Sequence, residues 1–216
     1  MALFDDSKKK FEFFDKGFIY NGETYNYIDI LHISYEGIVT DYKVNFVSVD
    51  ELKEALCEIE LKNGKTIKHK IEEKQYLVGF SQNKTAQIKE LQSVFVHLLK
   101  ESFESRLAYY QQEIDQNFYF SWKGAIGEDM FRVYPYLFIV RTRDGTTFSV
   151  ENSNFSRNSN EFIMTHKEAS PDLTLGSKLV RKMLRIGMEI ESRLTTKRDP
   201  DIFYYLLNKY MGIRFS

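Results

Sequence analysis

Residues 56–70 read Leu-Cys-Glu-Ile-Glu-Leu-Lys-Asn-Gly-Lys-Thr-Ile-Lys-His-Lys, two segments joined by Asn63-Gly64. Cys57, Ile59 and Leu61 alternate with glutamates, which predicts one buried and one solvated face. Asn-Gly is a favoured pair for tight hairpin turns, because both residues accept a positive φ. The stretch therefore predicts a hairpin whose one-sided burial is typical of an antiparallel sheet.

The same signals occur on both sides of this stretch. Asn21-Gly22 and Asp144-Gly145 are further turn pairs between residues of high strand propensity, and each predicts a hairpin. The first 75 residues therefore indicate β structure. The strands expected there are about 11–20, 23–34, 36–47, 54–62 and 65–73.

The apolar period changes at about Thr85. Apolar residues then recur every three or four positions, with no Pro or Gly between residues 80 and 123, which predicts one long helix or two helices with a bend. A second β region follows, with Pro135 expected at an edge or a bulge and strands at 118–123, 130–142 and 146–151. The Asn- and Ser-rich residues 152–161 predict a polar loop, followed by a short apolar piece at 162–164.

Two more helices are expected toward the C-terminal end. An apolar stripe from Leu179 to Leu194 predicts an amphipathic helix over about 176–197. Asp199 then supplies a capping carboxylate, Pro200 suits the first helical position, and Gly212 suits a left-handed terminator. The last helix is therefore expected over about 200–211.

The composition limits the class of protein. The 216 residues carry a net charge of −1 with a pI near 6.5, so no overall field attracts nucleic acid, and a nucleic-acid partner is not expected. The single Cys57 excludes an internal disulfide framework and a Cys-based zinc site, which fits a reducing compartment. Charges interrupt the apolar runs of the first twenty residues, and nowhere do 18 apolar residues occur together. We expect a cytoplasmic protein without a signal peptide or a transmembrane segment.

The two halves of the chain share a short stretch of similar sequence. A shift of 107 residues aligns Phe11, Phe13, Lys16, Gly17 and Ile19 with Phe118, Phe120, Lys123, Gly124 and Ile126. Two related modules would explain this match, and so would chance identities in an aromatic-rich chain. We predict an α+β fold in two domains, with a β module and its closing helix in residues 1–112 and a shorter β module with two C-terminal helices in residues 113–216.

The residues Gly17 to Gly22, followed by Tyr25-Asn26-Tyr27-Ile28-Asp29-Ile30-Leu31-His32-Ile33, are similar to bacterial pleckstrin-homology-like domains. In that family an opening hairpin leads to an acidic and an aliphatic residue, here Asp29-Ile30, before a further aliphatic, here Ile33. The hairpin at 58–70 and the helix from Thr85 stand where the family has its last strands and its closing helix. The resemblance covers about residues 11–110. It implies a bent antiparallel sheet capped by a helix, which binds lipids, peptides or other domains without a shared catalytic residue; the chain carries no phosphoinositide-binding signature.

Several motifs could carry chemistry, and each has a plainer interpretation. Gly64-Lys65-Thr66 matches the end of a phosphate-binding loop, but Ile59 stands at the required upstream glycine and a hairpin turn explains the motif. Cys57 lies on the predicted buried face and is expected to act as a small apolar side chain. Adjacent acids at 5–6, 50–51, 72–73 and 128–129 lie at predicted turns or strand ends, where solvated charge is ordinary.

The four histidines, His32, His69, His97 and His166, could bind a metal or move protons. No two of them lie within five residues of each other, and none has a carboxylate at metal-ligand spacing. We expect structural or surface roles for all four. The sequence therefore predicts no catalytic residue, no metal site and no cofactor.

A basic segment, residues 178–198, departs most from an ordinary surface, with seven bases and two acids. Lys178, Arg181, Lys182 and Arg185 share one face of the predicted helix, in first turns where the helix dipole disfavours cations. An acidic partner would offset that cost, so these four residues are the predicted partner-binding patch, for a protein or an anionic surface. A solvated face paired within the chain is the alternative interpretation.

The C-terminal run from Ile202 to Ile213 is apolar on more than one face of its helix. It either inserts between the two modules or docks on a second copy of the chain. Overall, we expect a non-enzymatic binding protein that docks a protein or an anionic partner. Two alternatives stay open: an enzyme whose site lies between the modules and uses His32 or His97 with a distant carboxylate, and a structural assembly subunit joined through the C-terminal helix.

Overall fold

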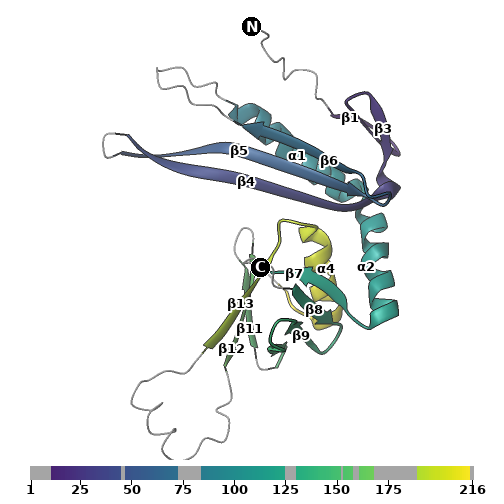
Figure 1. The fold of residues 1–216 in the computed structure, drawn as a ribbon, viewed down its shortest axis with the longest axis vertical. Coiled ribbons are helices and arrows are strands. Elements are labelled where there is room, and N and C mark those ends of the chain that lie inside the picture. The colour runs from purple at the N-terminus through teal and green to yellow at the C-terminus, as the bar shows by residue number, and fades with distance from the viewer. Residues whose placement is uncertain are drawn as a thin grey trace, which may run out of the picture. The chain divides into compact units, whose positions relative to one another are not determined.

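A computed structural model describes residues 11–44, 47–72, 84–124, 130–151, 153–157, 161–167 and 189–214. Within these ranges, thirteen strands form four antiparallel sheets, and three α-helices accompany them (Figure 1). The predicted α+β fold with antiparallel sheets and a C-terminal helix is confirmed. None of the helices in these ranges is long and apolar enough to cross a bilayer.

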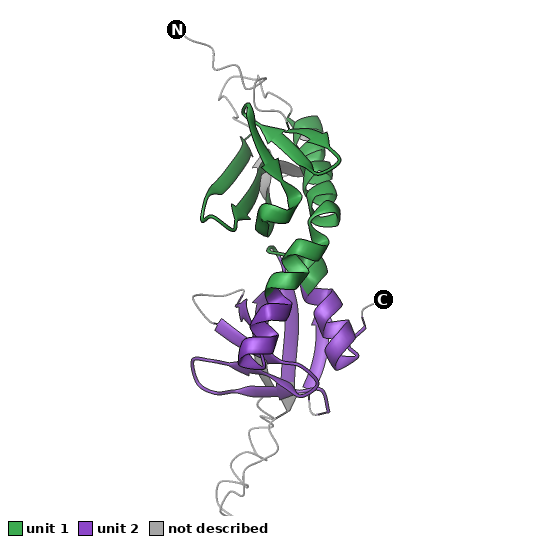
Figure 2. Cartoon of the chain, turned by 90° about the vertical axis from the view of Figure 1, so that its right-hand side faces the viewer, with its two compact units in different colours: residues 1–109, 197–202 green, residues 110–196, 203–216 purple. Residues whose placement is uncertain are grey.

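The chain divides into two compact units (Figure 2). Unit 1 comprises residues 1–109 and 197–202, and unit 2 comprises residues 110–196 and 203–216. The first change of unit lies inside helix α2 (Phe103–Asn117), close to the boundary predicted at residue 112. The return of residues 197–202 to unit 1 has no counterpart in the predicted division, because it depends on contacts between residues far apart in the sequence.

Unit 1 contains two three-stranded antiparallel sheets joined by a 3-10 turn at Tyr27–Asp29. The first sheet consists, in order, of β1 (Phe11–Phe14), β2 (Gly17–Tyr20) and β3 (Glu23–Asn26). The second consists of β4 (Ile30–Val44), β5 (Val47–Leu61) and β6 (Thr66–Glu72).

Several strand bounds predicted for unit 1 are wrong. The segment 11–20 is a hairpin rather than one strand, because Phe14 pairs with Gly17 across Asp15-Lys16, which lacks the Asn-Gly or Asp-Gly signal of a turn. The 3-10 turn divides the expected strand 23–34. The expected strand 36–47 is the continuation of β4 together with the start of β5, since β4 runs through Gly37 without a break.

The three predicted turn pairs each join two antiparallel strands, as expected. Asn21 and Gly22 have φ values of 54° and 80°, which a two-residue turn between β2 and β3 requires. Gly64, at φ 83°, ends the β5–β6 turn, where its N–H donates to the Leu61 carbonyl at 2.8 Å. Gly145, at φ 74°, lies in the corresponding turn of unit 2. Local turn chemistry is thus readable from two adjacent residues.

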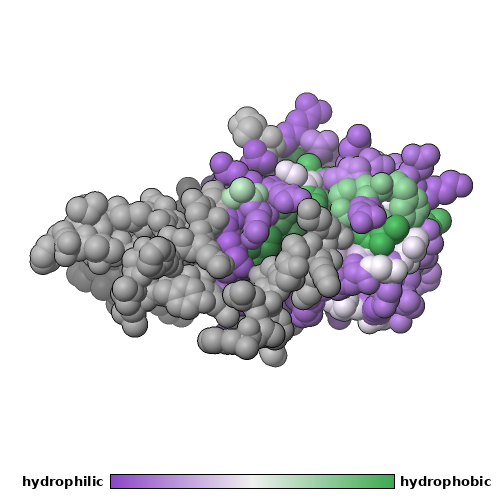
Figure 3. All heavy atoms as spheres, turned by 90° about the horizontal axis from the view of Figure 1, so that it is seen from above, coloured by the Kyte–Doolittle hydropathy of each residue, from purple (hydrophilic) through white to green (hydrophobic). Residues whose placement is uncertain are grey.

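The core of unit 1 lies between the two sheets and helix α1 (Thr85–Glu101). Cys57, Ile59 and Leu61 are buried, as their alternation predicts, and Ile88 and Leu98 are buried on one face of α1. The alternate positions of β5 and β6 carry cross-strand ion pairs, Lys68 with Glu58 at 2.6 Å and Lys70 with Glu54 at 3.0 Å. Figure 3 accordingly shows hydrophilic side chains over much of the described surface, with apolar side chains in smaller areas between them.

The helix predicted from Thr85 is two helices, α1 and α2, which meet at Ser102. The sequence left one helix or two as alternatives, and the second is confirmed. The Ser102 hydroxyl donates to the Leu98 carbonyl at 2.6 Å, and the Ser102 N–H donates to the same carbonyl at 3.0 Å. Such back-bonding by serine loosens the helical ladder and favours a bend.

Unit 2 begins with a four-stranded antiparallel meander. Its strands are β7 (Phe120–Lys123), β8 (Met130–Tyr134), β9 (Phe138–Arg141) and β10 (Thr147–Ser149). The single strand predicted over 130–142 is wrong, because Pro135 lies in a turn between β8 and β9 rather than at an edge or a bulge. Tyr136 follows it at φ 70°, and the Leu137 N–H donates to the Tyr134 carbonyl at 3.2 Å. Proline favours this turn position because its φ is already fixed.

A three-stranded sheet completes the β structure of unit 2: β11 (Ser153–Arg157), β12 (Glu161–Lys167) and β13 (Glu189–Thr195). The polar loop predicted over 152–161 is therefore wrong at 153–157 and 161, whereas 152 and 158–160 lie outside the described residues. The helix predicted over 176–197 is wrong at 189–195, and 176–188 lie outside the described residues. Leu194, opposite Phe162 on β12, is fully buried. A spacing of four, as between Ile190 and Leu194, fits one face of a strand as well as a helix, and pairing with β12 decides between them.

The last helix, α4 (Pro200–Met211), has the predicted bounds. Gly212 follows it at φ 67°, and its N–H donates to the Asn208 carbonyl at 3.1 Å, as a left-handed terminator does. Within unit 2, Phe203 packs against Trp122 of β7 and Phe162 of β12, with ring centroids 4.5 and 5.3 Å apart. The helix thus closes the two sheets of unit 2.

Gly17→Ala is expected to destabilise the protein by about 1–3 kcal/mol, because the new Cβ would lie 2.0 Å from the Tyr25 carbonyl oxygen and force β2 and β3 apart. Urea unfolding followed by circular dichroism measures the effect. Gly22→Asn is the matched control, since its site has open space and Asn tolerates a positive φ. Equal unfolding free energies for the two variants would contradict the close approach at Gly17.

Candidate functional site

The predicted basic patch, Lys178, Arg181, Lys182 and Arg185, lies outside the described residues. The end of the same basic segment is described, and there three bases pair with carboxylates of the chain. These pairs are Arg193 with Glu161 at 3.1 Å, Arg198 with Glu60 at 3.2 Å, and Lys197 with Glu36. This part of the segment therefore contributes its charge to pairing within the chain.

Three of the four histidines have ring contacts in the described part of the chain, and the side chain of His166 lies outside it. His69 Nδ1 lies 3.2 Å from the Tyr20 hydroxyl, and His97 Nε2 lies 3.2 Å from the Tyr27 hydroxyl. His32 Nδ1 lies 2.7 Å from an oxygen of Asp199. The first two contacts are part-buried hydrogen bonds, whereas the third belongs to a buried group of charges.

The remaining motifs have structural positions. Gly64-Lys65-Thr66 forms the β5–β6 turn and the start of β6, where Lys65 pairs with Glu23. Cys57 is buried in the core of unit 1, and this burial raises the pKa of its thiol to about 12. Of the predicted acid pairs, only Glu72 has a described side chain. Within the described ranges, no three His, Cys, Asp or Glu side chains are placed to hold a metal ion.

A buried group of charges in unit 1, which we name the Arg106 cluster, joins three regions of the chain. It comprises Ser102 and Arg106 from the helices, His32 from β4, and Asp199 and Asp201 from the start of α4. Arg106 and Asp199 are both fully buried. Charges removed from water are stable only when paired and hydrogen-bonded, so the surroundings of Arg106 decide its role.

Every N–H group of Arg106 has an acceptor. Its Nε donates to the Ser102 hydroxyl at 3.0 Å. Its Nη1 donates to Asp199 and to Asp201, both at 2.9 Å, and its Nη2 donates to the Leu99 carbonyl and to Asp201, both at 2.6 Å. A guanidinium has five N–H donors, so its hydrogen-bonding capacity is used in full.

Asp199 is equally engaged. One carboxylate oxygen accepts from Arg106 and from the backbone N–H of Ile33 at 3.0 Å, and the other lies against His32. Burial disfavours the charged carboxylate, but the His32 hydrogen bond and the Arg106 charge outweigh it, so the pKa of Asp199 is lowered. Burial likewise opposes the guanidinium charge, whereas Asp201 and Asp199 raise the pKa of Arg106 overall.

The backbone beside Asp199 forms an isolated antiparallel bridge with β4. The Tyr35 N–H donates to the Lys197 carbonyl at 3.0 Å, and the Asp199 N–H donates to the Ile33 carbonyl at 2.9 Å. Ser34 and Arg198 form the antiparallel bridge between these bonds. Together with the Arg106 cluster, this pairing holds residues 197–199 on unit 1.

Sequence reasoning missed this cluster and assigned Asp199 to helix capping. One signal was available, because Arg106 lies seven residues after Leu99 and four after Ser102, on the buried stripe of the helices. A lone arginine on such a stripe indicates a buried carboxylate partner. The identity of that partner required the tertiary structure.

The contacts of the Arg106 cluster favour a structural role over a catalytic one. A histidine 2.7 Å from a carboxylate is a geometry that general bases use. Here the same carboxylate also neutralises Arg106 and accepts the Ile33 N–H, and His32 itself is buried. The negative charge of Asp199 is therefore committed to holding the segment in place.

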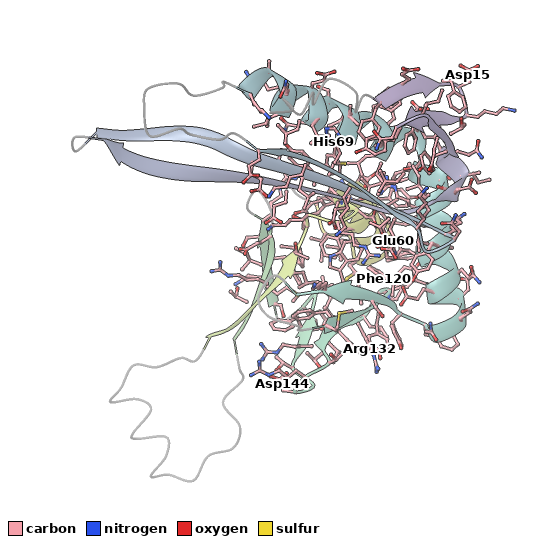
Figure 4. All side chains as sticks on the ribbon, turned by 45° about the horizontal axis from the view of Figure 1, so that its top comes forward. Asp15, Glu60, His69, Phe120, Arg132 and Asp144 are labelled. Carbon is pink, nitrogen blue, oxygen red and sulfur yellow. The ribbon has the colours of Figure 1, made fainter. Side chains whose placement is uncertain are left out.

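The second candidate site is the outer side of the β7–β10 sheet in unit 2, which we name the aromatic face. Alternate residues of the sheet are buried on the inner side, whereas Arg132 is exposed on the outer side (Figure 4). The outer positions are Tyr119, Ser121, Lys123, Met130, Arg132, Tyr134, Phe138, Val140, Thr147 and Ser149. None of these ten positions is acidic, and three of them carry aromatic rings, Tyr119, Tyr134 and Phe138.

Three rings form a row across the aromatic face. Tyr119 and Tyr134 have ring centroids 5.3 Å apart, and Tyr134 and Phe138 have centroids 5.0 Å apart. The Arg132 guanidinium lies over the Tyr119 ring, 5.0 Å from its centroid. The β8–β9 turn beside the row exposes Tyr136 at 71% and Leu137 at 58%. Tyr, Met and Arg are enriched at the cores of protein interfaces, so this surface suits docking.

Asp199→Asn is expected to destabilise the protein by about 3 kcal/mol near neutral pH, because it removes a charge that compensates the buried Arg106. A lowered folded pKa gives stability that is present above the unfolded pKa of a carboxyl group and is lost as the pH falls through the folded value. Urea unfolding at a series of pH values should show the difference between wild type and variant shrinking toward acid. Asp144→Asn, in an exposed pair with Arg141, is the control with a smaller effect. A difference that did not change with pH would contradict this account.

Cys57 is expected to resist alkylation in the folded protein. Its thiol is buried, with a pKa of about 12, so very little thiolate is present near neutral pH. Mass spectrometry after iodoacetamide treatment should show labelling only in denaturant. Rapid labelling under native conditions would show that the β5–β6 core opens readily.

Comparison with known proteins found no matching family model, no matching curated protein and no matching solved structure. The candidate functional residues are therefore those that tertiary contacts bring together in this fold. Two such groups stand out in the described part of the chain: the Arg106 cluster, which is buried and saturated, and the aromatic face, which is partly exposed.

Proposed function

We propose that the chain is a non-enzymatic docking protein built from two pleckstrin-homology-like modules. The order of elements supports this proposal. Unit 1 proceeds from sheet β1–β3 to sheet β4–β6 and then to α1, and unit 2 proceeds from sheet β7–β10 to sheet β11–β13 and then to α4. The resemblance implies a bent antiparallel sheet capped by a helix, and in each unit antiparallel sheets are followed along the chain by a helix.

Particular residues also support the tandem arrangement. Ile30 and Ile33, the aliphatic positions of the resemblance, are both fully buried in unit 1. Phe13 and Phe120, which the shift of 107 residues aligns, lie in the first strand of their respective units. A shared ancestry of the two modules would account for the matching positions of Phe13 and Phe120.

The aromatic face is the single observation that carries the docking function. It offers a partner a row of aromatic rings and two cations, Lys123 and Arg132, on one sheet. Docking needs a complementary surface and no reacting group. We therefore assign the binding activity to unit 2. The Arg106 cluster has a structural role, which is to hold residues 197–199 on unit 1.

An enzyme that uses His32 is the alternative, and the contact of His32 with Asp199 is the observation that favours it. The bond of Asp199 to Arg106 weighs against it, because a carboxylate that already compensates a guanidinium charge stabilises a protonated imidazole less strongly. Docking is the better account of the described surface.

The docking function is tested with the partner captured from the source cells, identified, purified and titrated calorimetrically against the full chain. Tyr134→Ala combined with Phe138→Ala should weaken binding by at least roughly tenfold, because it removes the centre of the aromatic row. Ile28→Ala, at a residue of unit 1 that is 67% exposed, is the matched control and should bind like wild type.

Two outcomes would contradict the docking function. One is unchanged affinity in the Tyr134 and Phe138 variant, provided that circular dichroism shows a folded protein. The other is turnover of a small molecule by the chain that is lost in His32→Asn, which would favour the enzyme. Light scattering of the same samples separates docking from the assembly alternative, which requires a concentration-dependent oligomer.

A further inference from the structure

The positions of the cations on the aromatic face indicate which chemical class of partner would fit it. Lys123 of β7 lies opposite Met130 of β8, and Arg132 is two residues further along β8. Lys123 and Arg132 are therefore diagonal neighbours on adjacent strands, about 7–8 Å apart at their Cα atoms. Both side chains are exposed.

The same diagonal continues onto β9. Arg132 lies opposite Val140, and Phe138, two residues along β9, lies opposite Tyr134 in the aromatic row. The line Lys123, Arg132, Phe138 thus presents two cations and then a ring at nearly equal steps. Side chains on one side of an extended peptide repeat at about 6.8 Å, close to the same step.

We infer that the aromatic face binds an extended acidic segment of a partner protein, with the pattern acid, any residue, acid, any residue, apolar. The two carboxylates would meet Lys123 and Arg132, and the apolar side chain would rest on the ring of Phe138. This inference rests on the proposed docking function and adds the chemical class of the partner segment that docks.

Arg132 suits a carboxylate in particular. Its guanidinium carbon lies 5.0 Å from the centroid of the Tyr119 ring, and a guanidinium binds carboxylates through its N–H groups. The Tyr119 contact therefore holds the guanidinium beside the ring row by a cation–π interaction. The neighbouring Glu113 carboxylate of α2 accepts the Ser121 N–H at 3.1 Å.

Two other occupants fit the face less well. A second copy of the chain, docked face to face about a two-fold axis, would offer no carboxylate from the described outward positions of the sheet to pair with Lys123 and Arg132. A nucleic acid would need more neutralising charge than two side chains on a chain of net charge −1 and pI near 6.5. An acidic polypeptide segment needs only the two cations and the aromatic row.

The test uses the full chain and fluorescein-labelled peptides in an anisotropy titration. The acidic probe is Ser-Glu-Thr-Glu-Thr-Phe-Ser, the basic probe carries Lys at both Glu positions, and a short oligothymidylate is the third probe. The acidic peptide should bind at least roughly tenfold more tightly than the basic one at low salt, and the preference should shrink as salt is added.

Lys123→Glu combined with Arg132→Glu should invert the preference, so that the basic peptide binds more tightly. A role of these residues in folding alone would not produce this inversion. Lys62→Glu combined with Lys89→Glu is the matched control, because it changes the net charge equally at exposed positions of unit 1 and should keep the wild-type preference.

Several results would overturn the inference. These are equal binding of the two peptides, an acidic preference that survives in the Lys123 and Arg132 variant, tighter binding of oligothymidylate that this variant loses, and self-association that this variant loses. A native partner that requires Tyr134 and Phe138 but tolerates the loss of both cations would overturn the inference and leave docking intact. A native partner indifferent to the aromatic row would instead overturn docking itself.

Discussion

The contact between Arg106 and Asp199 is the constraint on which unit 1 depends. Both side chains are removed from water, and a buried charge without a partner costs several kcal/mol. Five N–H groups of Arg106 and both oxygens of Asp199 are bonded, so any movement of residues 197–199 or of α2 breaks several charged bonds at once. The cluster thus fixes the backbone path of residues 197–199, which their local sequence alone would hold only weakly.

The consequence for the backbone is the isolated antiparallel bridge between Arg198 and Ser34 of β4. Two backbone hydrogen bonds at an exposed edge would be marginal by themselves, whereas the cluster fixes Asp199 beside Ile33 and keeps the edge paired. Pro200 then starts α4, whose apolar side chains close unit 2 around Trp122 and Phe162. One charged contact therefore bears on elements in both halves of the sequence.

Charges have opposite roles in the two units. In the Arg106 cluster they are saturated and inaccessible, which suits a fixed structure and leaves little capacity for chemistry. On the aromatic face Lys123 and Arg132 are exposed beside a row of rings, without a carboxylate among the outward positions of the sheet. This contrast is the physical basis of our proposal that the protein binds a partner.

The amino-acid sequence alone specified the three glycine turns, the buried strand face of Cys57, Ile59 and Leu61, and the bounds of α4. Each of these features depends on residues only a few positions apart: a turn pair, an alternation of apolar and polar residues, or the Asp199-Pro200 pair at the start of a helix. Residues 189–195 became a strand only because β12 lies beside them, since an apolar spacing of four fits both a helix and a strand. The Arg106 cluster and the aromatic face were likewise decided by tertiary structure. Arg106 and Asp199 are 93 residues apart, and the ring row is built from strands whose register no local pattern specifies.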